Sequence, residues 1–217
     1  AKLLTCHAKL VDTALRDLWR ISALPSSVAL IAVGGYGRGE LFPNSDVDVL
    51  VLLPAAPGPD QQREVEAFVG RLWDIGVEAG HSVRTVEECI DQSELDVTVQ
   101  TSLLEARLIS GSRSLFRRFV AAMSKAMQPR AFYKAKQLEQ EQRHERFHET
   151  NLEPNIKEGA GGLRDLHHVL WIGRASGIAR SWPALVREGL ITAQEARTAA
   201  RSLRMLQDLR IRLHFCA

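Results

Sequence analysis

The sequence predicts an α+β fold, in which a small mixed β-sheet unit packs against a C-terminal helical unit. Apolar runs typical of buried strands occur in the first half of the chain, interleaved with amphipathic segments. Their order is strand, glycine turn, strand, helix, strand, short helix and strand, which differs from the regular alternation of a doubly wound parallel sheet. Beyond residue 111 strand patterns are almost absent. We therefore expect one unit over residues 1–111 and a helical unit over residues 112–217.

The first unit opens with an amphipathic helix over residues 2–22, which ends before Pro25 because proline cannot continue a helix. Two continuously apolar segments, Val28–Val33 and Val47–Leu53, predict buried strands on either side of a glycine turn. The remaining expected elements are a turn or short helix at 36–41, a helix at 61–78, a strand at 81–86, a short helix at 87–92, a strand at Leu95–Val99 and a helix at 101–109.

The second unit is expected to contain helices only. They span residues 114–127, 131–149, 163–171 and 192 onward, and a glycine-rich loop that contains Pro154 precedes the third. His144 and His148 lie four residues apart on the second helix, which is a spacing that metal ligands use. Because many charged residues surround them, we interpret this helix as presenting a solvated face instead.

The bulk composition excludes several classes of protein. The 217 residues carry a formal net charge of +2, which gives no general attraction to nucleic acid or to a membrane surface. No apolar run approaches the roughly 18 residues of a membrane span, and the N-terminus lacks a signal-peptide pattern. Cys6, Cys89 and Cys216 are too far apart for a disulfide framework or a zinc-ligand spacing. We expect a cytoplasmic protein and, because both ends fall within helical patterns, part of a longer chain.

The most informative motif is a pair of glycines after the first strand and a pair of aspartates at the start of the second. Gly34 and Gly35 end the first apolar run, and Asp46 and Asp48 stand two residues apart. Residues two apart in a strand point to the same face, so both carboxylates project together. Like charges this close repel each other, and a divalent metal between them would turn the repulsion into binding. The alternative is a turn cap and an edge-strand charge, but the preceding glycine pair favours the metal site.

This motif and its surroundings resemble a known family. An apolar segment, Gly-Gly and then Asp-apolar-Asp resemble the nucleotidyltransferase superfamily typified by DNA polymerase beta. Three longer blocks, at residues 34–48, 77–89 and 152–166, resemble the bacterial PII uridylyltransferase/uridylyl-removing family. The resemblance implies transfer of UMP from UTP to a tyrosine of the PII nitrogen-regulatory protein, with release of pyrophosphate. It also implies that the hydrolase domain that removes UMP and the domains that sense glutamine lie outside this chain.

The resemblance assigns roles to the acidic residues. Asp46 and Asp48 are expected to hold Mg²⁺, with Mn²⁺ as the alternative ion, and a third carboxylate on a neighbouring strand completes the metal site and helps to deprotonate the nucleophile. Asp96, in the expected strand Leu95–Val99, lies where this carboxylate is expected. Glu94 competes with it, because strand alternation places both on one face, and a strand-end cap is the structural alternative for Asp96.

The residues around the glycine pair are expected to bind the triphosphate of UTP. Gly34 and Gly35 would let backbone N–H groups meet the β- and γ-phosphates, an approach that a Cβ atom would block. Arg38 is expected to pair with the triphosphate, with a solvated turn residue as the alternative. Ser45 could contact phosphate, although capping of the turn is favoured.

A second group of candidate residues lies in the glycine-rich loop: Lys157, Gly161, Gly162 and Asp165. A glycine-rich loop that opens onto a helix presents backbone N–H groups to an anion, and Lys157 would add positive charge. The resemblance implies that UTP lies in a cleft between the two units. The alternative is a structural loop, with Asp165 favourably placed in the first turn of the helix.

Two other functions stay open at this point. One is a different nucleotidyltransferase, such as an adenylyltransferase, because base choice is not written in the metal motif. The other is a catalytically inactive domain that binds nucleotide or a partner for regulation. The presence of Gly34, Gly35, Asp46, Asp48 and a candidate third carboxylate favours an active enzyme.

Overall fold

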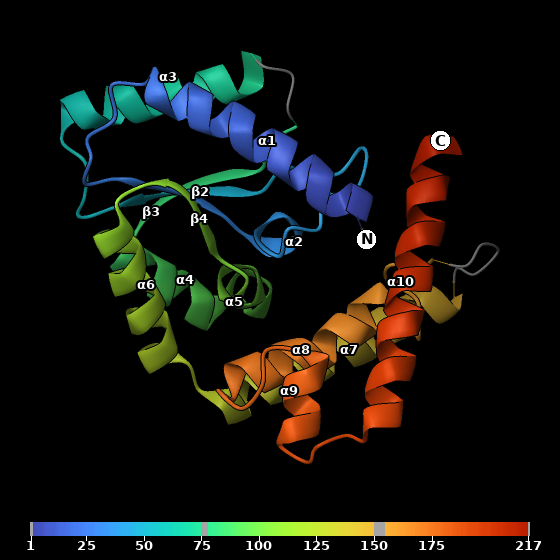
Figure 1. Ribbon diagram of the computed structural model, residues 1–217. Helices are drawn as coiled ribbons and strands as arrows, with labels where there is room; N and C mark the ends of the chain where they lie inside the picture. The colour runs from blue at the N-terminus through green and yellow to red at the C-terminus, as the bar shows by residue number, and fades with distance from the viewer. Residues whose placement is uncertain (1, 75–77, 150–154, 217) are drawn as a thin grey trace. The chain divides into compact units, whose positions relative to one another are not determined.

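The computed structural model describes residues 2–74, 78–149 and 155–216. The parts of expected elements at 75–77 and at 150–154, Pro154 included, lie outside the described residues. The chain divides into two compact units, Lys2–Ala126 and Met127–Ala217, and each is described by itself. A small mixed sheet in the first unit and helices in both confirm the predicted α+β class (Figure 1).

The sheet of the first unit contains four strands in the order β3-β2-β1-β4. The strands are β1 (Ala29–Ala32), β2 (Val49–Leu53), β3 (His81–Thr85) and β4 (Arg107–Gly111). β1 runs antiparallel to both β2 and β4, whereas β2 and β3 are parallel. All residues of β1 and β2 are buried, as expected of continuously apolar runs that have sheet on both sides.

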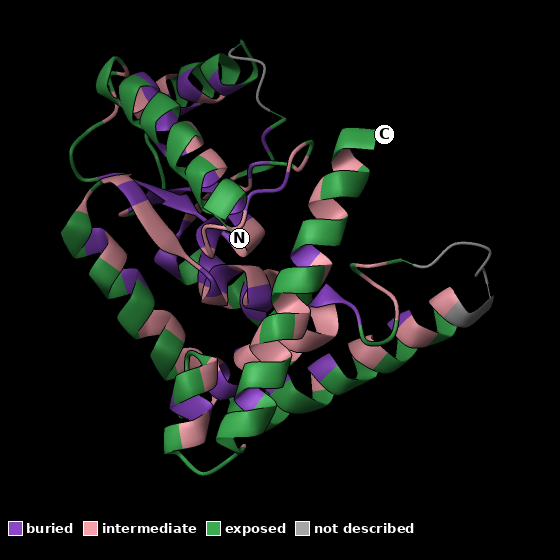
Figure 2. Cartoon of the chain, turned by 45° about the vertical axis from the view of Figure 1, so that its right-hand side comes forward, coloured by how far each residue is buried: buried purple, intermediate pink, exposed green. Residues whose placement is uncertain are grey.

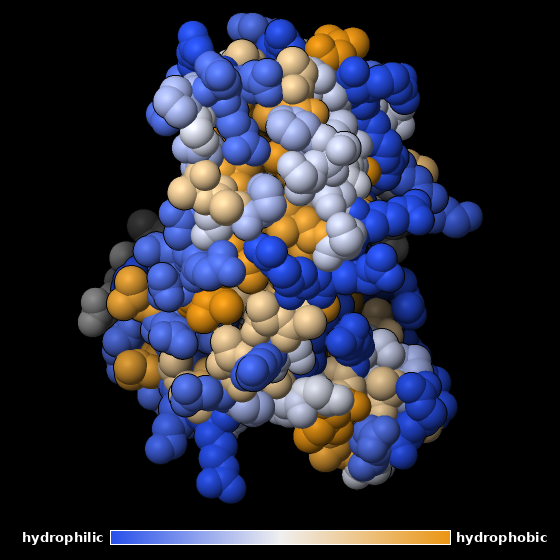
Figure 3. All heavy atoms as spheres, turned by 90° about the vertical axis from the view of Figure 1, so that its left-hand side faces the viewer, coloured by the Kyte–Doolittle hydropathy of each residue, from blue (hydrophilic) through white to orange (hydrophobic). Residues whose placement is uncertain are grey.

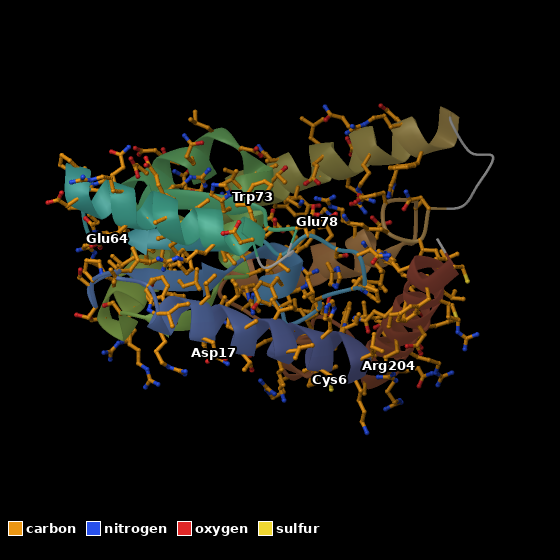
Figure 4. All side chains as sticks on the ribbon, turned by 90° about the horizontal axis from the view of Figure 1, so that it is seen from above. Cys6, Asp17, Glu64, Trp73, Glu78 and Arg204 are labelled. Carbon is orange, nitrogen blue, oxygen red and sulfur yellow. The ribbon has the colours of Figure 1, made fainter. Side chains whose placement is uncertain are left out.

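Helices cover both faces of this sheet (Figure 1). α1 (Lys2–Arg20) and α3 (Pro59–Asp74) lie side by side on one face, as Figure 4 shows from above. α4 (Val86–Leu95), α5 (Val97–Leu104) and α6 (Arg113–Ala126) lie on the other face. The two faces have separate apolar cores, and alternate residues of β2 enter one core or the other.

The structure corrects two elements of the prediction. The segment Leu95–Val99, expected as a strand, is the junction of α4 and α5. A capping box on Thr85 starts α4, and the side chain of Asp96 caps α5, so local capping outweighs the apolar alternation. Residues 107–109, expected at the end of a helix, belong to β4 instead.

The first unit also continues past residue 111, because α6 packs beneath the sheet. Leu115 and Phe119 of α6 are buried in the same core as Leu50 and Leu52 of β2. The change in composition therefore marks the end of the sheet, and the compact unit ends one helix later.

The second unit consists of helices within its described residues. They are α7 (Pro129–Glu149), α8 (Leu163–Ala175), α9 (Trp182–Arg187) and α10 (Ala193–Cys216). Figure 2 shows buried positions (purple) as separate patches on the helices and as continuous runs on β1 and β2, whereas β3 and β4 are largely intermediate (pink). On the surface in Figure 3 hydrophilic residues predominate and apolar ones are scattered. No helix in the described part of the chain has the length and apolarity that crossing a membrane requires.

Candidate functional site

The segment Asp46–Asp48 comes directly before β2 and extends the sheet in that direction. Its backbone is bonded on both sides: Val33 N–H donates to the carbonyl of Asp48 at 3.1 Å, and Val47 N–H donates to the carbonyl of Glu78 at 2.8 Å. Val47 is buried in the core beneath α1 and α3. Alternation therefore directs Asp46 and Asp48 to the opposite face, which α4, α5 and α6 cover farther along. Asp46 is exposed there and Asp48 is half-buried.

Glycines make room for the carboxylate of Asp48. A Cβ atom at Gly34 would lie 3.3 Å from Asp48 Oδ2 and 3.3 Å from the hydroxyl oxygen of Ser102. A Cβ atom at Gly80 would lie 2.5 Å from Asp48 Oδ1, which is closer than such atoms approach in real proteins. Asp48 therefore lies where the glycine turn, the segment before β3 and α5 come together. Ser102, which the sequence did not single out, is on α5 beside this carboxylate.

The glycine turn is the short helix α2 (Gly34–Gly37). Gly34 has a φ of +56°, in the left-handed region that glycine adopts without strain. Val33 before it is extended, so the chain turns sharply from β1 into α2. The first N–H groups of a helix have no partner within the helix. In α2 these include the N–H groups of Gly34 and Gly35. The turn thus places backbone donors next to the carboxylate of Asp48.

Arg38 and Ser45 lie near the turn with partners of their own. Arg38 Nε is 3.1 Å from Glu40 Oε2, and its Nη1 is 3.5 Å from Glu105 Oε2. Ser45 N–H donates to the carbonyl of Phe42 at 3.2 Å in a surface turn. Both have structural contacts, and nucleotide contact by either remains a prediction.

Asp96 and Glu94 occupy places that the sequence did not predict. Asp96 is exposed and accepts a 2.6 Å hydrogen bond from Thr98 N–H at the start of α5, and Glu94 is exposed on α4. Because neither lies on a strand, the alternation argument for a shared face fails. Over the described ranges, no three His, Cys, Asp or Glu side chains form a group that could hold a metal ion, so a third carboxylate beside Asp46 and Asp48 stays a prediction.

Glu78, three residues before β3, is a further carboxylate near this site that the sequence did not single out. The bonds from Val47 to Glu78 and from Val49 to Gly80 continue the parallel register of β2 and β3. This register places Ala79 beside Val47, and both are buried in the same core. Glu78 therefore lies level with Asp46 and faces the same way. The sequence pattern that could have indicated this carboxylate is Glu-Ala-Gly directly before a strand, with Ala79 buried. Figure 4 labels Glu78 just beyond α3, which carries Trp73.

In the second unit, the glycine-rich loop is held by a side chain of its own and by close packing of its backbone. The side chain of Asn155 accepts hydrogen bonds from Lys157 N–H at 3.0 Å and from Glu158 N–H at 2.8 Å. Gly161 has a φ of +73°, and a Cβ atom at Gly162 would lie 2.7 Å from the carbonyl of Ile156. The turn therefore requires glycine at both positions. The side chain of Lys157 is 51% exposed and lies 3.4 Å from Glu158.

Asp165 fastens this loop to α7 and α8. It accepts hydrogen bonds from Gly161 N–H at 2.8 Å, from Arg143 at 2.6 Å and from Gln140 at 3.0 Å, and it lies 3.0 Å from His144 Nε2. Burial alone would raise the pKa of Asp165, but these hydrogen bonds and the charge of Arg143 outweigh burial and lower it. One side of α7 is therefore packed and ion-paired, and the interpretation of this helix as solvated is wrong for that side. The side chain of His148 lies outside the described residues.

Curated relatives match the chain from end to end. It is 53% identical over 223 residues to the bifunctional uridylyltransferase/uridylyl-removing enzyme of Nitrosospira multiformis. It is 52% identical over 217 residues to the enzyme of the same name from Burkholderia mallei, and 53% over 219 residues to that from Burkholderia lata. These alignments cover 99%, 99% and 100% of the chain. The chain belongs to this family. It spans about a quarter of the length of these relatives, at 25%, 25% and 26%.

Two family models match this uridylyltransferase family segment, one in each of the two structural units. A nucleotidyltransferase domain matches residues 11–109, which contain the glycine turn and the paired aspartates. The model described as GlnD PII-uridylyltransferase matches residues 131–217, which contain the glycine-rich loop and α8. The candidate residues of each unit therefore lie inside matched regions.

Proposed function

We propose that this chain transfers UMP from UTP to a tyrosine of a PII signalling protein and releases pyrophosphate. The observation that carries the proposal is the carboxylate pair Asp46 and Asp48 on one face of the sheet, beside the Gly34 turn, in a matched nucleotidyltransferase domain. The names of the relatives support uridylyl transfer. Removal of UMP and a response to glutamine belong, in this proposal, to other parts of the protein. We place the reaction in the cytoplasm, where nucleoside triphosphates are available.

The residues present suit a divalent cation. Mg²⁺ commonly binds through one or two carboxylates together with substrate phosphates, and Asp46 and Asp48 supply two carboxylates next to backbone donors. Mg²⁺, or Mn²⁺ in its place, would neutralise the charge that develops on the phosphate oxygens. Oxygen ligands are typical of both ions.

The remaining residues of the first unit bind and orient the nucleotide. Gly34 and Gly35 N–H groups would donate to the phosphate oxygens, and the absence of Cβ atoms lets the triphosphate approach. The Ser102 hydroxyl beside Gly34 is a further donor. Arg38 would add positive charge in competition with Glu40 and Glu105, while Ser45 shapes the turn that leads to Asp46.

The transfer itself requires a base. The tyrosine hydroxyl oxygen bonds to the α-phosphorus of UTP as the bond to the β-phosphate oxygen breaks, and the hydroxyl proton moves to a carboxylate. We assign this proton to Glu78, because its segment is hydrogen-bonded to that of Asp46, in preference to Asp96, which caps a helix.

The loop of the second unit has a supporting role in this proposal. Lys157 would offer positive charge to an anion at this loop, since it is the more exposed partner of its ion pair with Glu158. Gly161 and Gly162 form the turn, and Asp165 holds it through Gly161 N–H. Asp165 would therefore act through the loop.

The direct test measures label transfer from α-labelled UTP to a PII protein in the presence of Mg²⁺. The wild-type chain should label a PII tyrosine, and Asp48→Asn should lower the rate by about 100-fold or more, because a ligand to the metal is lost. Label from ATP in preference to UTP would instead identify an adenylyltransferase. Binding of nucleotide with no transfer would identify a regulatory domain.

The same assay distinguishes the two candidates for the third carboxylate. Glu78→Gln should lower kcat by about 100-fold, the usual contribution of a general base, with little change in the KM for UTP. Asp96→Asn should keep most of the activity, because asparagine caps a helix nearly as well as aspartate. The opposite result, a large loss in Asp96→Asn only, would restore Asp96 as the catalytic carboxylate.

A further inference from the structure

An ionic network centred on the buried carboxylate of Asp12 contacts the glycine turn. Arg107 of β4 donates to both carboxylate oxygens of Asp12 on α1, at 2.7 and 3.0 Å. The Tyr36 hydroxyl donates to Asp12 Oδ1 at 2.6 Å. The side chain of Asp12 is only 8% exposed, and Tyr36 is buried. Three elements that are distant in sequence therefore meet at one carboxylate.

Arg107 also binds the backbone of the turn. Its Nη2 donates to the carbonyl of Tyr36 at 3.2 Å, and its Nε donates to the carbonyl of Gly37 at 3.3 Å. The guanidinium carbon lies 5.3 Å from the centre of the Tyr36 ring. In the sheet Arg107 pairs with Ala32, two residues before the turn. One rigid side chain thus joins the strand and both carbonyls at the end of α2.

The charges in this network stabilise one another. Burial would raise the pKa of Asp12, but the hydrogen bonds from Arg107 and Tyr36 and the charges of Arg107 and Arg16 outweigh burial and lower it. Burial and the charge of Asp12 raise the pKa of Tyr36 above its ordinary value, so the phenol stays protonated and continues to donate. Asp12 therefore remains the ionised anchor of a guanidinium fork, the arrangement that best fixes arginine geometry.

We propose that Arg107 is a positioning residue for nucleotide binding: anchored by Asp12 and Tyr36, it holds the Gly34–Gly37 turn so that its N–H groups face the phosphates. This inference rests on the proposed function for its ligand. Its structural part, that Arg107 fixes the turn, stands on the contacts alone. Lysine would keep the charge but lose the fork, so it cannot hold Asp12 and both carbonyls together.

Arg16 provides a matched control. It donates to Asp12 Oδ2 at 3.2 Å and to the carbonyl of Ile109 at 3.2 Å, so it shares the anchor and also bonds to β4. None of the contacts found for its side chain in the described part of the chain involves the glycine turn. Arg16→Lys therefore perturbs the same cluster without releasing the turn.

The experiment compares the full chain with Arg107→Lys, Tyr36→Phe and Arg16→Lys, each at a temperature where it is folded. Two quantities are measured without and with nucleotide, respectively: amide hydrogen exchange of Gly37 and Arg38, whose N–H groups donate to the carbonyls of Val33 and Gly34, and the Kd for Mg-UTP. In Arg107→Lys, the exchange rate in the turn and the Kd for Mg-UTP should each rise by about tenfold, as expected when hydrogen bonds to a charged group are lost. Tyr36→Phe should show a smaller change in the same direction, and Arg16→Lys should show neither.

Each outcome decides one claim. Unchanged exchange in Arg107→Lys overturns the positioning role, whatever the nucleotide does. Equal effects in Arg107→Lys and Arg16→Lys also overturn it, because general loosening would then explain both. The third outcome is faster exchange in the turn of Arg107→Lys only, together with no binding of Mg-UTP to the wild type. This result would support the positioning of the turn by Arg107 and would contradict the proposed function.

Discussion

Gly34 satisfies two requirements at once. Its φ of +56° lies in the left-handed region, and its missing Cβ leaves room for Asp48 Oδ2 and the Ser102 hydroxyl. A side chain at this position would meet both a conformational cost and a contact with the carboxylate that we assign to the metal. The two costs can be separated, because Gly39, two residues beyond the turn, shares only the first.

Gly34→Ala should therefore reduce nucleotide transfer far more than its effect on stability explains. The left-handed conformation costs alanine about 1 kcal/mol, and the crowding of Asp48 should add at least a tenfold loss of transfer. Gly39→Ala is the control, because Gly39 has a φ of +74° but no atom within 4 Å of an added Cβ. Thermal unfolding and label transfer measure the two effects. Equal loss of transfer in both variants would mean that strain alone matters.

Local patterns predict some residues of the site, and long-range contacts hide others. Gly34, Gly35, Asp46 and Asp48 follow from a strand ending in glycines and from two-residue alternation, which are local. Arg107 could not be assigned, because it meets Asp12 across 95 positions of the sequence. The alternation around Asp96 suggested a strand, but capping by Thr85 and by Asp96 itself produced two helices.

At the scale of elements, α7 and α8 are joined by charges where the sequence suggested a solvated helix. Lys136 of α7 is 1% exposed, ion-pairs with Glu139 and lies 4.7 Å from the Trp171 ring of α8. Arg143 of α7 is also buried and binds the Glu158 carbonyl and Asp165. A charged residue type alone does not show whether a neighbouring helix will supply its partner, so the sequence could not separate the packed side of α7 from its wet side.

The stability of these helices should fall as the solution is acidified, in two stages. Burial and the charge of Lys136 lower the pKa of His168 from its ordinary 6.5, so the unfolded chain takes up this proton first. The pKa values of Glu158 and Asp165 are also lowered, from 4.5 and 3.8: burial opposes this, but Arg164 and Arg143 outweigh it. Their contributions are present above those ordinary values and are lost as pH falls through the folded values.

Amide hydrogen exchange of α7 and α8, corrected for the intrinsic pH dependence of exchange, measures this loss. Wild-type protection should begin to fall below about pH 6.5, and fall again below about pH 4.5. His168→Gln cannot titrate, so only the second stage should remain. Protection that rises on acidification, or a first stage that persists in His168→Gln, would contradict this assignment.

For the molecule as a whole, hydrophobic patterning predicted the architecture and left the register unassigned. Val28–Val33 and Val47–Leu53 contain β1 and β2, and the glycine turn connects the first of these strands to α2. The parallel pairing of β2 with β3 depends on which strands lie side by side, and it is this pairing that brings Glu78 level with Asp46. Sequence order carries no such information for a mixed sheet, so the position of Glu78 beside Asp46 could not be predicted from the sequence.

The central claim is that Asp46, Asp48 and the Gly34 turn form the nucleotide site. The most direct measurement is a crystal structure of the chain with Mg²⁺ and a UTP analogue that cannot be transferred. We expect a metal ion bound by the carboxylates of Asp46 and Asp48, with phosphate oxygens accepting hydrogen bonds from Gly34 and Gly35 N–H. A triphosphate bound elsewhere, with neither aspartate on the metal, would contradict it.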